Sequence, residues 1–314
     1  MQAFIVRRFL SSIVVLFMVT LVTFFSLNVL PGDIASRILG PEPSPDQVEA
    51  LRLRLNLDAP IYERYIDWIT DAVQGDLGTS IRTQVPVRDV LIDKLEVTVE
   101  LGLLSLLLAT VIAVPVGILA GSRPGTFLDY GLTLFAVAGV SIPNFWLAIV
   151  MIITFSVGLG WFPALGFTPI SEGLFENLRS LTLPAIAIGV TSAGSLARQV
   201  RGAMVEVMRQ DYVRTARAKG LGERAVILRH GLRNALIPVV TVLGLQMTVI
   251  IGGSIIIETI FQLPGIGKLL IESILIQEVS IVQGLTVMLA AGILFLNLMV
   301  DISYAYLDPR IRYS

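Results

Sequence analysis

The sequence predicts an all-α membrane protein with six transmembrane helices, an extracytoplasmic helical insertion after the first helix and a basic cytoplasmic loop with helical character before the fifth. Of its 314 residues 54% are hydrophobic and 15% charged, and the mean hydropathy is +0.80. A soluble domain of this length is less apolar. Charged residues are absent from six long runs, and about 20 apolar residues cross a bilayer as a helix. The runs are Phe9–Leu30, Leu101–Ser122, Tyr130–Ser171, Ser180–Ala197, Asn234–Ile257 and Val279–Val300.

The first run predicts an uncleaved transmembrane helix within residues 1–30. Arg7 and Arg8 resemble the basic start of a signal peptide, but the 22 residues of the run exceed a typical signal core. No small-residue cleavage site follows, because the run ends in Leu30-Pro31-Gly32-Asp33. We therefore expect this helix to remain in the membrane.

Residues 31–95 predict a small extracytoplasmic helical subdomain. Prolines in the segment Pro41–Pro45 precede Asp46, a helix-capping residue type, and the amphipathic stretch Val48–Leu57. The string Gly75-Asp76-Leu77-Gly78-Thr79-Ser80 is expected to be a plain turn, since glycine spacing alone is weak evidence for a phosphate site.

Residues 96–307 are predicted to form the membrane core with five helices, followed by a cytoplasmic tail, 308–314. The run Tyr130–Ser171 has 42 residues, but the cluster Gly158–Pro163 breaks it and leaves too little for a second span. A second span would also move the basic residues that follow it to the outside, against the positive-inside bias. Four prolines are expected to kink or start helices: Pro115, Pro143, Pro184 and Pro238.

The basic residues orient the six spans with both termini in the cytoplasm. In this arrangement 14 Lys and Arg lie inside, nine of them between Arg198 and Arg233, against Arg179 and Lys268 in the short outer loops. Lys and Arg in short loops favour the cytoplasmic side. The other seven lie in the segment 31–100, which is too long to influence orientation strongly.

The composition speaks against several classes of site. The chain has no cysteine and one histidine, His230, so we predict no metal site, disulfide or cofactor. Gly265-Ile266-Gly267-Lys268 lacks the first glycine and the Ser or Thr of a nucleotide-binding loop. Motifs of intramembrane enzymes are absent from the sequence, and nothing supports binding of nucleic acid. No catalytic residue is therefore predicted, and the chain is not expected to be an enzyme.

The segment Arg198–Arg233 predicts a helix, a glycine corner and a second helix at the membrane surface. Apolar residues recur at helical spacing before Gly220-Leu221-Gly222 ends the first helix, and a second helical stretch begins at Glu223. Composition alone favours a topology signal that lies against anionic lipid headgroups. The apolar positions are Val205, Met208, Tyr212 and Ala216.

The string Tyr212-Val213-Arg214-Thr215-Ala216-Arg217-Ala218-Lys219-Gly220-Leu221 resembles the cytoplasmic signature loop of ABC importer permeases, most closely the peptide, opine and nickel group. The general signature opens with Glu-Ala-Ala, whereas Arg214-Thr215-Ala216 stands here, as is usual in the peptide-type subgroup. The resemblance extends along the chain through Leu30-Pro31-Gly32-Asp33, Gly75–Ser80, Phe261–Gly267 and Leu307–Tyr313.

This resemblance implies that the loop 205–235 couples the chain to a separate ATPase subunit. It also implies a bacterial or archaeal cytoplasmic (inner) membrane, a second homologous permease subunit, two ATPase subunits, an extracytoplasmic solute-binding protein, and oligopeptides or dipeptides as substrate. Basic residues of the loop, Arg224 among them, are expected to steer an acidic rim of the ATPase. The coupling residues that the resemblance implies are Arg214, Thr215, Ala216, Arg217, Ala218, Lys219, Gly220 and Leu221.

Polar residues within the spans are candidates for a substrate path, because polar groups that face lipid are costly. We single out Asn144, Ser192 and Gln246, with helix packing as the alternative role. A self-sufficient secondary carrier is disfavoured, because the charge-free runs contain no acidic residue for ion coupling. A non-peptide solute, namely a nickel chelate, glutathione, an opine, an oligosaccharide or haem, stays open.

Overall fold

A computed structural model describes residues 2–29, 34–39, 43–54 and 56–307. These residues are almost entirely helical, and no strand is present among them beyond an isolated bridge. Five helices of the described residues are long and apolar enough to cross a membrane, and the count is six when one bent helix pair is taken as a single span. The predicted all-α fold class is confirmed, while the predicted tail 308–314 lies outside the described residues.

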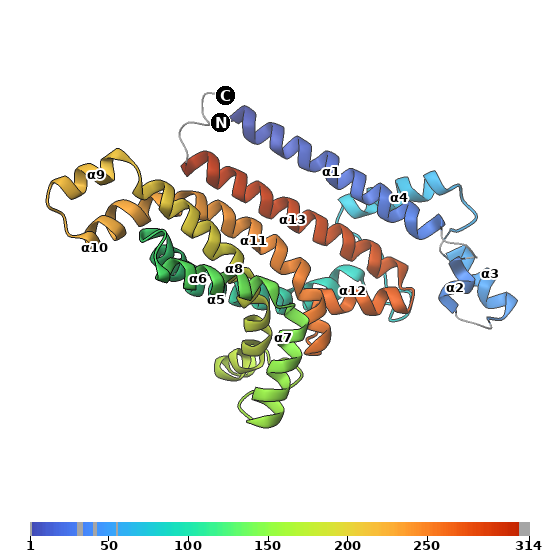
Figure 1. The fold of residues 1–314 in the computed structure, drawn as a ribbon. Helices are drawn as coiled ribbons and strands as arrows, with labels where there is room; N and C mark the ends of the chain where they lie inside the picture. The colour runs from blue at the N-terminus through green and yellow to red at the C-terminus, as the bar shows by residue number, and fades with distance from the viewer. Residues whose placement is uncertain (1, 30–33, 40–42, 55, 308–314) are drawn as a thin grey trace. The chain divides into compact units, whose positions relative to one another are not determined.

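The helices follow one another along the chain as labelled in Figure 1. They are α1 (Gln2–Val29), α2 (Ile34–Leu39), α3 (Pro45–Arg54), α4 (Ile61–Val73), α5 (Val87–Ser122), α6 (Phe127–Ser141), α7 (Asn144–Met151), the π-helix η1 (Ile152–Gly158), the 3₁₀-helix η2 (Ile170–Glu172), α8 (Leu174–Met208), α9 (Asp211–Ala218), α10 (Glu223–Ala225), the π-helix η3 (Val226–Leu232), α11 (Arg233–Ile260), α12 (Ile266–Leu275) and α13 (Val279–Leu307).

The chain divides into two compact units. The large unit comprises residues 97–267 and the end of α13 from residue 296. The small unit comprises residues 2–96 and 268–295. Three helices, α5, α12 and α13, therefore contribute one part to each unit.

In the small unit, aromatic side chains fasten α4 to α1. Tyr65 of α4 is buried, and its hydroxyl lies 2.9 Å from Oγ1 of Thr20. The rings of Phe24 and Tyr65 meet edge to face with centroids 5.4 Å apart, and Trp68 stacks on the same phenylalanine. Such contacts stabilise aromatic pairs beyond the area they bury. The tie holds a segment that precedes α5 against the first span.

The predicted glycine turn of the small unit is confirmed as a turn. Gly75 and Gly78 have φ values of +88° and +80°, a region that glycine enters without steric cost. The turn ends in an isolated antiparallel bridge between Thr79 and Pro86. Upstream, α3 covers residues 48–54 of the stretch that the sequence places at 48–57, and residues 56–57 lie in a turn.

The run Tyr130–Ser171 contains a sharp bend that its composition does not reveal. The helix pair from Phe127 to Gly158 turns by 90° between α6 and α7. Pro143 is the N-cap of α7, and a proline disfavours helical geometry in the residue before it. The predicted break at Gly158–Pro163 also exists, because η1 ends at Gly158. One bent span therefore replaces the straight span that hydropathy suggests.

Two spanning helices extend well beyond their charge-free runs. α8 covers 174–208 instead of 180–197, so Arg198 and Arg201 continue a membrane helix and do not open a loop. α5 likewise begins at Val87. An absence of charge marks the part of a helix that sits in hydrocarbon, whereas helical hydrogen bonds continue into its polar ends. Of the four prolines, Pro143 starts a helix and the others lie inside α5, α8 and α11.

The core of the large unit is built around α8. One buried cluster joins α8 to α5, α6, α9, η3 and α11, and a second joins it to α5, α7 and α11. Glycines on α5 let the two helix backbones approach closely. A Cβ added to Gly117 would lie 2.5 Å from Cβ of Val200, and one added to Gly121 would lie 2.6 Å from Cβ of Met204. α8 is therefore the most firmly held helix of this unit.

Candidate functional site

The short helix α9 is anchored to the end of α8. Val213 and Ala216 are 0% and 5% exposed and belong to one apolar cluster with Met208 and Val226. The sequence predicted one continuous amphipathic helix with Tyr212 on its apolar side, and this is wrong. α8 ends at Met208, and the break shifts the helical phase, so Tyr212 is 43% exposed and Val213 takes the buried position.

The glycine corner after α9 is a Schellman motif. The N–H of Gly220 donates to the carbonyl of Arg217 at 2.9 Å, and the N–H of Leu221 donates to the carbonyl of Ala216 at 3.4 Å. Gly220 has φ +81°, the left-handed conformation that this motif requires. A Cβ on Gly220 would meet no atom within 4 Å. Backbone conformation, and not lack of space, therefore demands glycine here.

A bidentate ion pair spans this corner. Nη2 and Nε of Arg217 lie 2.8 and 3.1 Å from the two carboxylate oxygens of Glu223, at the start of α10. The hydrogen bonds from Arg217 lower the pKa of Glu223, and the same bonds raise the pKa of Arg217. Both side chains are about half exposed, so the pair adds at most about 1 kcal/mol. Its main effect is geometric, since it fixes the angle between α9 and α10.

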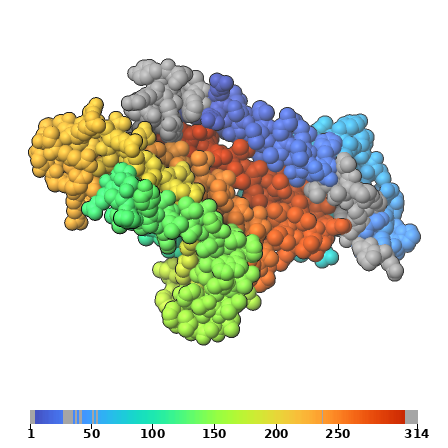
Figure 2. Space-filling view, viewed as in Figure 1, coloured from blue at the N-terminus to red at the C-terminus, as the bar shows by residue number. Residues whose placement is uncertain are grey.

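Of the predicted coupling residues, one is buried, one is about half exposed and bound in the ion pair, and six are exposed outside that pair. Ala216 faces the core, and Arg217 is held by Glu223. Leu221 is 40% exposed at the tip of the corner. We call the exposed residues the corner surface; they are Arg214, Thr215, Ala218, Lys219, Gly220 and Leu221. Figure 1 shows α9 and α10 projecting beyond the ends of α8 and α11 that they join. In the same view, Figure 2 shows no other segment in front of the outer edge of these two helices.

An ion pair between a buried carboxylate and a partly exposed guanidinium ties α6 to the same end of α8. Asp129 is 1% exposed, and its two oxygens accept hydrogen bonds from Nε and Nη2 of Arg201 at 2.5 and 2.8 Å. The backbone N–H of Gly125 donates to the same carboxylate at 2.9 Å. Breaking a buried pair is costly because one charge is left without a partner. No sequence pattern predicts this contact, because 72 residues separate the two side chains.

At the other end of α11, a buried carboxyl group organises a tight turn. Glu258 is 0% exposed. Its Oε1 accepts from the hydroxyl of Thr98 at 2.8 Å, and its Oε2 accepts from the N–H of Gly267 at 2.7 Å. The hydroxyl of Thr98 in turn accepts from the N–H of Ile266 at 3.0 Å. The motif Phe261–Gly267 is thus folded around one side chain.

Two glycines of this turn allow its close approach to the carboxyl group. A Cβ on Gly265 would lie 2.5 Å from Cδ of Glu258, and one on Gly267 would lie 2.6 Å from Cα of Ile255. Glu258 lies one residue beyond the charge-free run Asn234–Ile257 but still within the candidate span of α11. A spanning helix therefore carries an acid that the count over charge-free runs did not include. The hydroxyl of Thr98 and the N–H of Gly267 donate to the two oxygens of this carboxyl group, which indicates a structural role.

A second buried carboxyl group holds the turn of the small unit. Glu278 is 3% exposed and accepts from the backbone N–H groups of Ile81 and Arg82 at 3.2 and 2.8 Å. The hydroxyl of Ser80 lies 3.3 Å from the same carboxylate. In both units, a motif that sequence similarity had marked is therefore built on a buried glutamate. For Glu258, the signal available in the sequence was a single acid shortly before the glycine-containing string Phe261–Gly267, whereas the stretch around Glu278 contains no glycine.

The three substrate-path candidates lie on three different helices, α7, α8 and α11. Ser192 and Gln246 are each 7% exposed. Asn144 begins α7 at the bend, and its Nδ2 would lie 3.6 Å from a Cβ on Gly253 of α11, so this asparagine takes part in helix packing. None of the three is among the residues that line the apolar pocket between α5, α6 and α8. Among the described residues, no cluster of acidic or histidine side chains suited to a metal is found.

Family models match nearly the whole chain. Residues 113–313 match the family described as binding-protein-dependent transport system inner membrane component. Residues 1–102 match the model of the N-terminal part of such membrane components. The junction between the two matches lies within α5.

Individual relatives are similar over their full length. The chain is 42% identical to a putative peptide transport system permease protein of Brucella abortus and 40% identical to the oligopeptide transport system permease protein AppB of Bacillus subtilis, with 100% of each chain covered. Among solved structures, an inward-facing conformation of the MetNI methionine ABC transporter matches with a TM-score of 0.58 and 20% identity. That match covers 70% of this chain and 96% of the other, and it shows a shared fold.

Proposed function

Because the chain belongs to the family of inner membrane components of binding-protein-dependent transport systems, we propose that it is the permease subunit of an ATP-driven importer of oligopeptides or dipeptides. The full-length relatives named for peptide transport support this substrate class. The chain carries the path through the membrane, and ATP hydrolysis takes place on a separate subunit.

The corner surface is the contact for the ATPase in this proposal, and its construction is the observation that carries the assignment. The Schellman motif and the pair Arg217–Glu223 give the corner one shape, while Lys219 and Leu221 remain exposed for a partner. An exposed leucine beside basic residues suits a groove with an apolar floor and an acidic rim.

The helix α8 transmits movement from the corner into the membrane. α9 is packed on the end of α8 through Val213 and Ala216, and α8 is clamped to α5 at Gly117 and Gly121. A force applied to the corner therefore displaces packed helices and not a loose loop. When the ATPase subunits close on ATP, the corner follows them, and the permease halves rock between inward-facing and outward-facing states.

Six spans supply half of a transport pore, so the proposed complex contains a second homologous permease and two ATPase subunits. An extracytoplasmic binding protein delivers the peptide. The complex lies in the bacterial or archaeal cytoplasmic membrane with both termini of this chain inside, since most basic residues fall on that side.

Single-cysteine cross-linking tests the coupling contact, because the chain has no cysteine of its own. In the purified complex, Ala218→Cys is expected to cross-link to a cysteine on the ATPase through a short bis-maleimide, with a yield that changes when ATP is added. The control is Gly202→Cys on α8, which is exposed and where a Cβ meets no atom within 4 Å. Equal yields from both variants, or none from Ala218→Cys, would show that the corner does not touch the ATPase.

The substrate class is tested with the reconstituted complex and its binding protein. Binding protein loaded with dipeptides or oligopeptides should raise ATP hydrolysis above the rate with empty binding protein. A nickel chelate, an opine, an oligosaccharide, haem and glutathione should give no increase. If one of these solutes raises ATP hydrolysis and peptides do not, that solute is the substrate and the permease assignment still holds.

The orientation is tested by labelling intact cells. Gln47→Cys on α3 should react with a membrane-impermeant maleimide, and Gln210→Cys, between α8 and α9, should react only after the cells are opened. Both native side chains are exposed. Labelling of Gln210→Cys in intact cells would invert the topology.

A further inference from the structure

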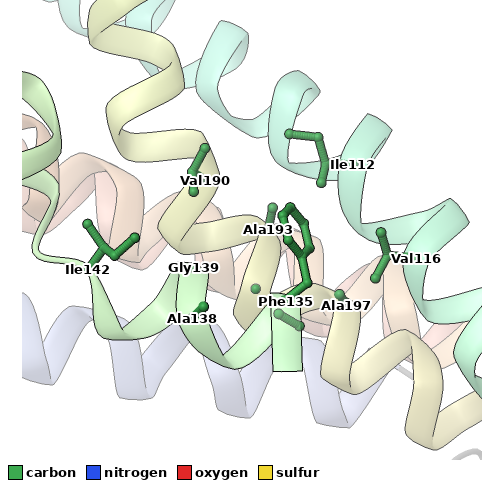
Figure 3. A pocket seen from close by; sticks show the side chains of 11 residues that line it. Ile112, Val116, Phe135, Ala138, Gly139, Ile142, Val190, Ala193 and Ala197 are labelled. Atoms are coloured by element: carbon green, nitrogen blue, oxygen red, sulfur yellow. The ribbon is translucent and has the colours of Figure 1, made fainter. Parts of the chain in front are cut away.

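The large unit contains an apolar pocket that the transport proposal does not use. It lies between α5, α6 and α8 and has a volume of about 130 Å³. Figure 3 shows side chains from the three helices facing a common space, among them Ile112, Val116, Phe135, Val190 and Ala193. Apolar cavities of roughly 150 Å³ stay dry and admit a benzene-sized molecule. A stretch of hydrocarbon therefore suits this pocket, and a hydrated peptide does not.

One end of the pocket continues into a narrow recess that reaches two arginines. Val116, Ala136 and Ala197 line both spaces, and the recess is completed by residues that include Arg198 and Arg201. Asp129 already binds the guanidinium of Arg201. Arg198 is exposed, and no salt bridge to it occurs within the part of the chain that the structure describes. A hydrocarbon-sized space thus ends beside one cation that is available to a ligand.

We propose that this pocket holds one acyl chain of an anionic phospholipid whose phosphate contacts Arg198. The membrane that surrounds a permease supplies such a ligand at high concentration. The basic residues place Arg198 on the cytoplasmic side, where a basic residue near the membrane surface attracts anionic lipids. An aromatic side chain of the second permease would account for the apolar lining but would leave the cation at its end unexplained. The lipid would brace α6 against α8 at the level of the Asp129–Arg201 pair.

Photo-cross-linking in the assembled complex tests the site. The complex is reconstituted into vesicles that contain phosphatidylglycerol or phosphatidylcholine with the same diazirine-bearing acyl chain, and the labelled peptides are mapped after irradiation. Phosphatidylglycerol adducts are expected on α5, α6 and α8 at the pocket, with a lower yield from phosphatidylcholine.

Two variants, each with a matched control, separate this site from general contact with lipid. Ala138→Trp fills the rim of the pocket, and Gly131→Trp adds the same bulk two turns away on α6, where a Cβ meets no atom within 4 Å. Arg198→Gln removes the cation, and Arg233→Gln makes the same charge change outside the pocket. Ala138→Trp should remove most pocket adducts. Arg198→Gln should lower the preference for phosphatidylglycerol about fivefold, the effect of one basic residue near an anionic surface.

Three outcomes would overturn the proposal. The first is the absence of adducts on the pocket peptides. The second is labelling that is equal for both headgroups and unchanged by Ala138→Trp, which indicates lipid at the general protein surface only. The third needs a variant with a photoreactive benzophenone amino acid in place of Ala138: its cross-linking to the second permease in place of lipid would make the pocket a protein interface.

Discussion

Gly220→Trp is expected to abolish solute uptake while the chain still inserts into the membrane at its normal level. A side chain at φ +81° strains the Schellman corner by about 1–2 kcal/mol, and the indole also blocks close approach of a partner to the corner surface. The site is exposed, and a Cβ added there meets no protein atom within 4 Å. The packed spans should therefore keep their stability.

Two further variants separate the effect of backbone strain at Gly220 from the effect of the size of the side chain. Gly202→Trp places the same side chain on the exposed face of α8 in open space and should leave uptake unchanged. Gly220→Ala introduces the backbone strain with little bulk and should reduce uptake partially. Measurements are uptake of labelled solute in cells, membrane level of the variant, and retention of the ATPase on purification. If Gly220→Trp takes up solute at the wild-type rate, the corner is not the coupling contact, and the basic loop serves only as a topology signal.

Gly265→Ala is expected to destabilise the large unit severely. The new Cβ would lie 2.5 Å from Cδ of Glu258, and neither group has room to move, because hydrogen bonds from Thr98 and Gly267 hold the carboxyl group. Either the turn opens or the carboxyl group loses its donors in a buried site, at a cost of about 3 kcal/mol. The apparent Tm of the detergent-solubilised complex should fall by about 5–10 °C.

Gly252→Ala is the matched control for this effect. It adds the same methyl group to α11 at an exposed position where no atom lies within 4 Å. Alanine is a better helix former than glycine, so the apparent Tm of the complex with Gly252→Ala should stay level or rise slightly. Glu258→Ala should resemble Gly265→Ala, because it leaves the same buried N–H and hydroxyl groups without their acceptor. If Gly265→Ala unfolds at the same temperature as Gly252→Ala, the turn is not built on Glu258.

The sequence by itself determined the features that depend on solvent and on local backbone chemistry. Each of the six charge-free runs corresponds to a helix or helix pair with spanning character, since only a helix satisfies its backbone polar groups within hydrocarbon. Pro143 starts a helix, and Gly220 ends one, because both restrictions act within a few residues. The motifs of the signature loop also led to the correct family.

The tertiary structure alone decided which polar side chains pair and which faces are buried. Arg217 was expected to point at a partner, but Glu223 lies across the corner and binds it. Asp129 and Arg201 meet through the packing of α6 on α8, and Glu258 finds Thr98 from a distant helix. Tyr212 turned outward because the helix broke two residues earlier. Hydropathy depends on one residue at a time, whereas a hydrogen bond between distant segments exists only after the helices have packed.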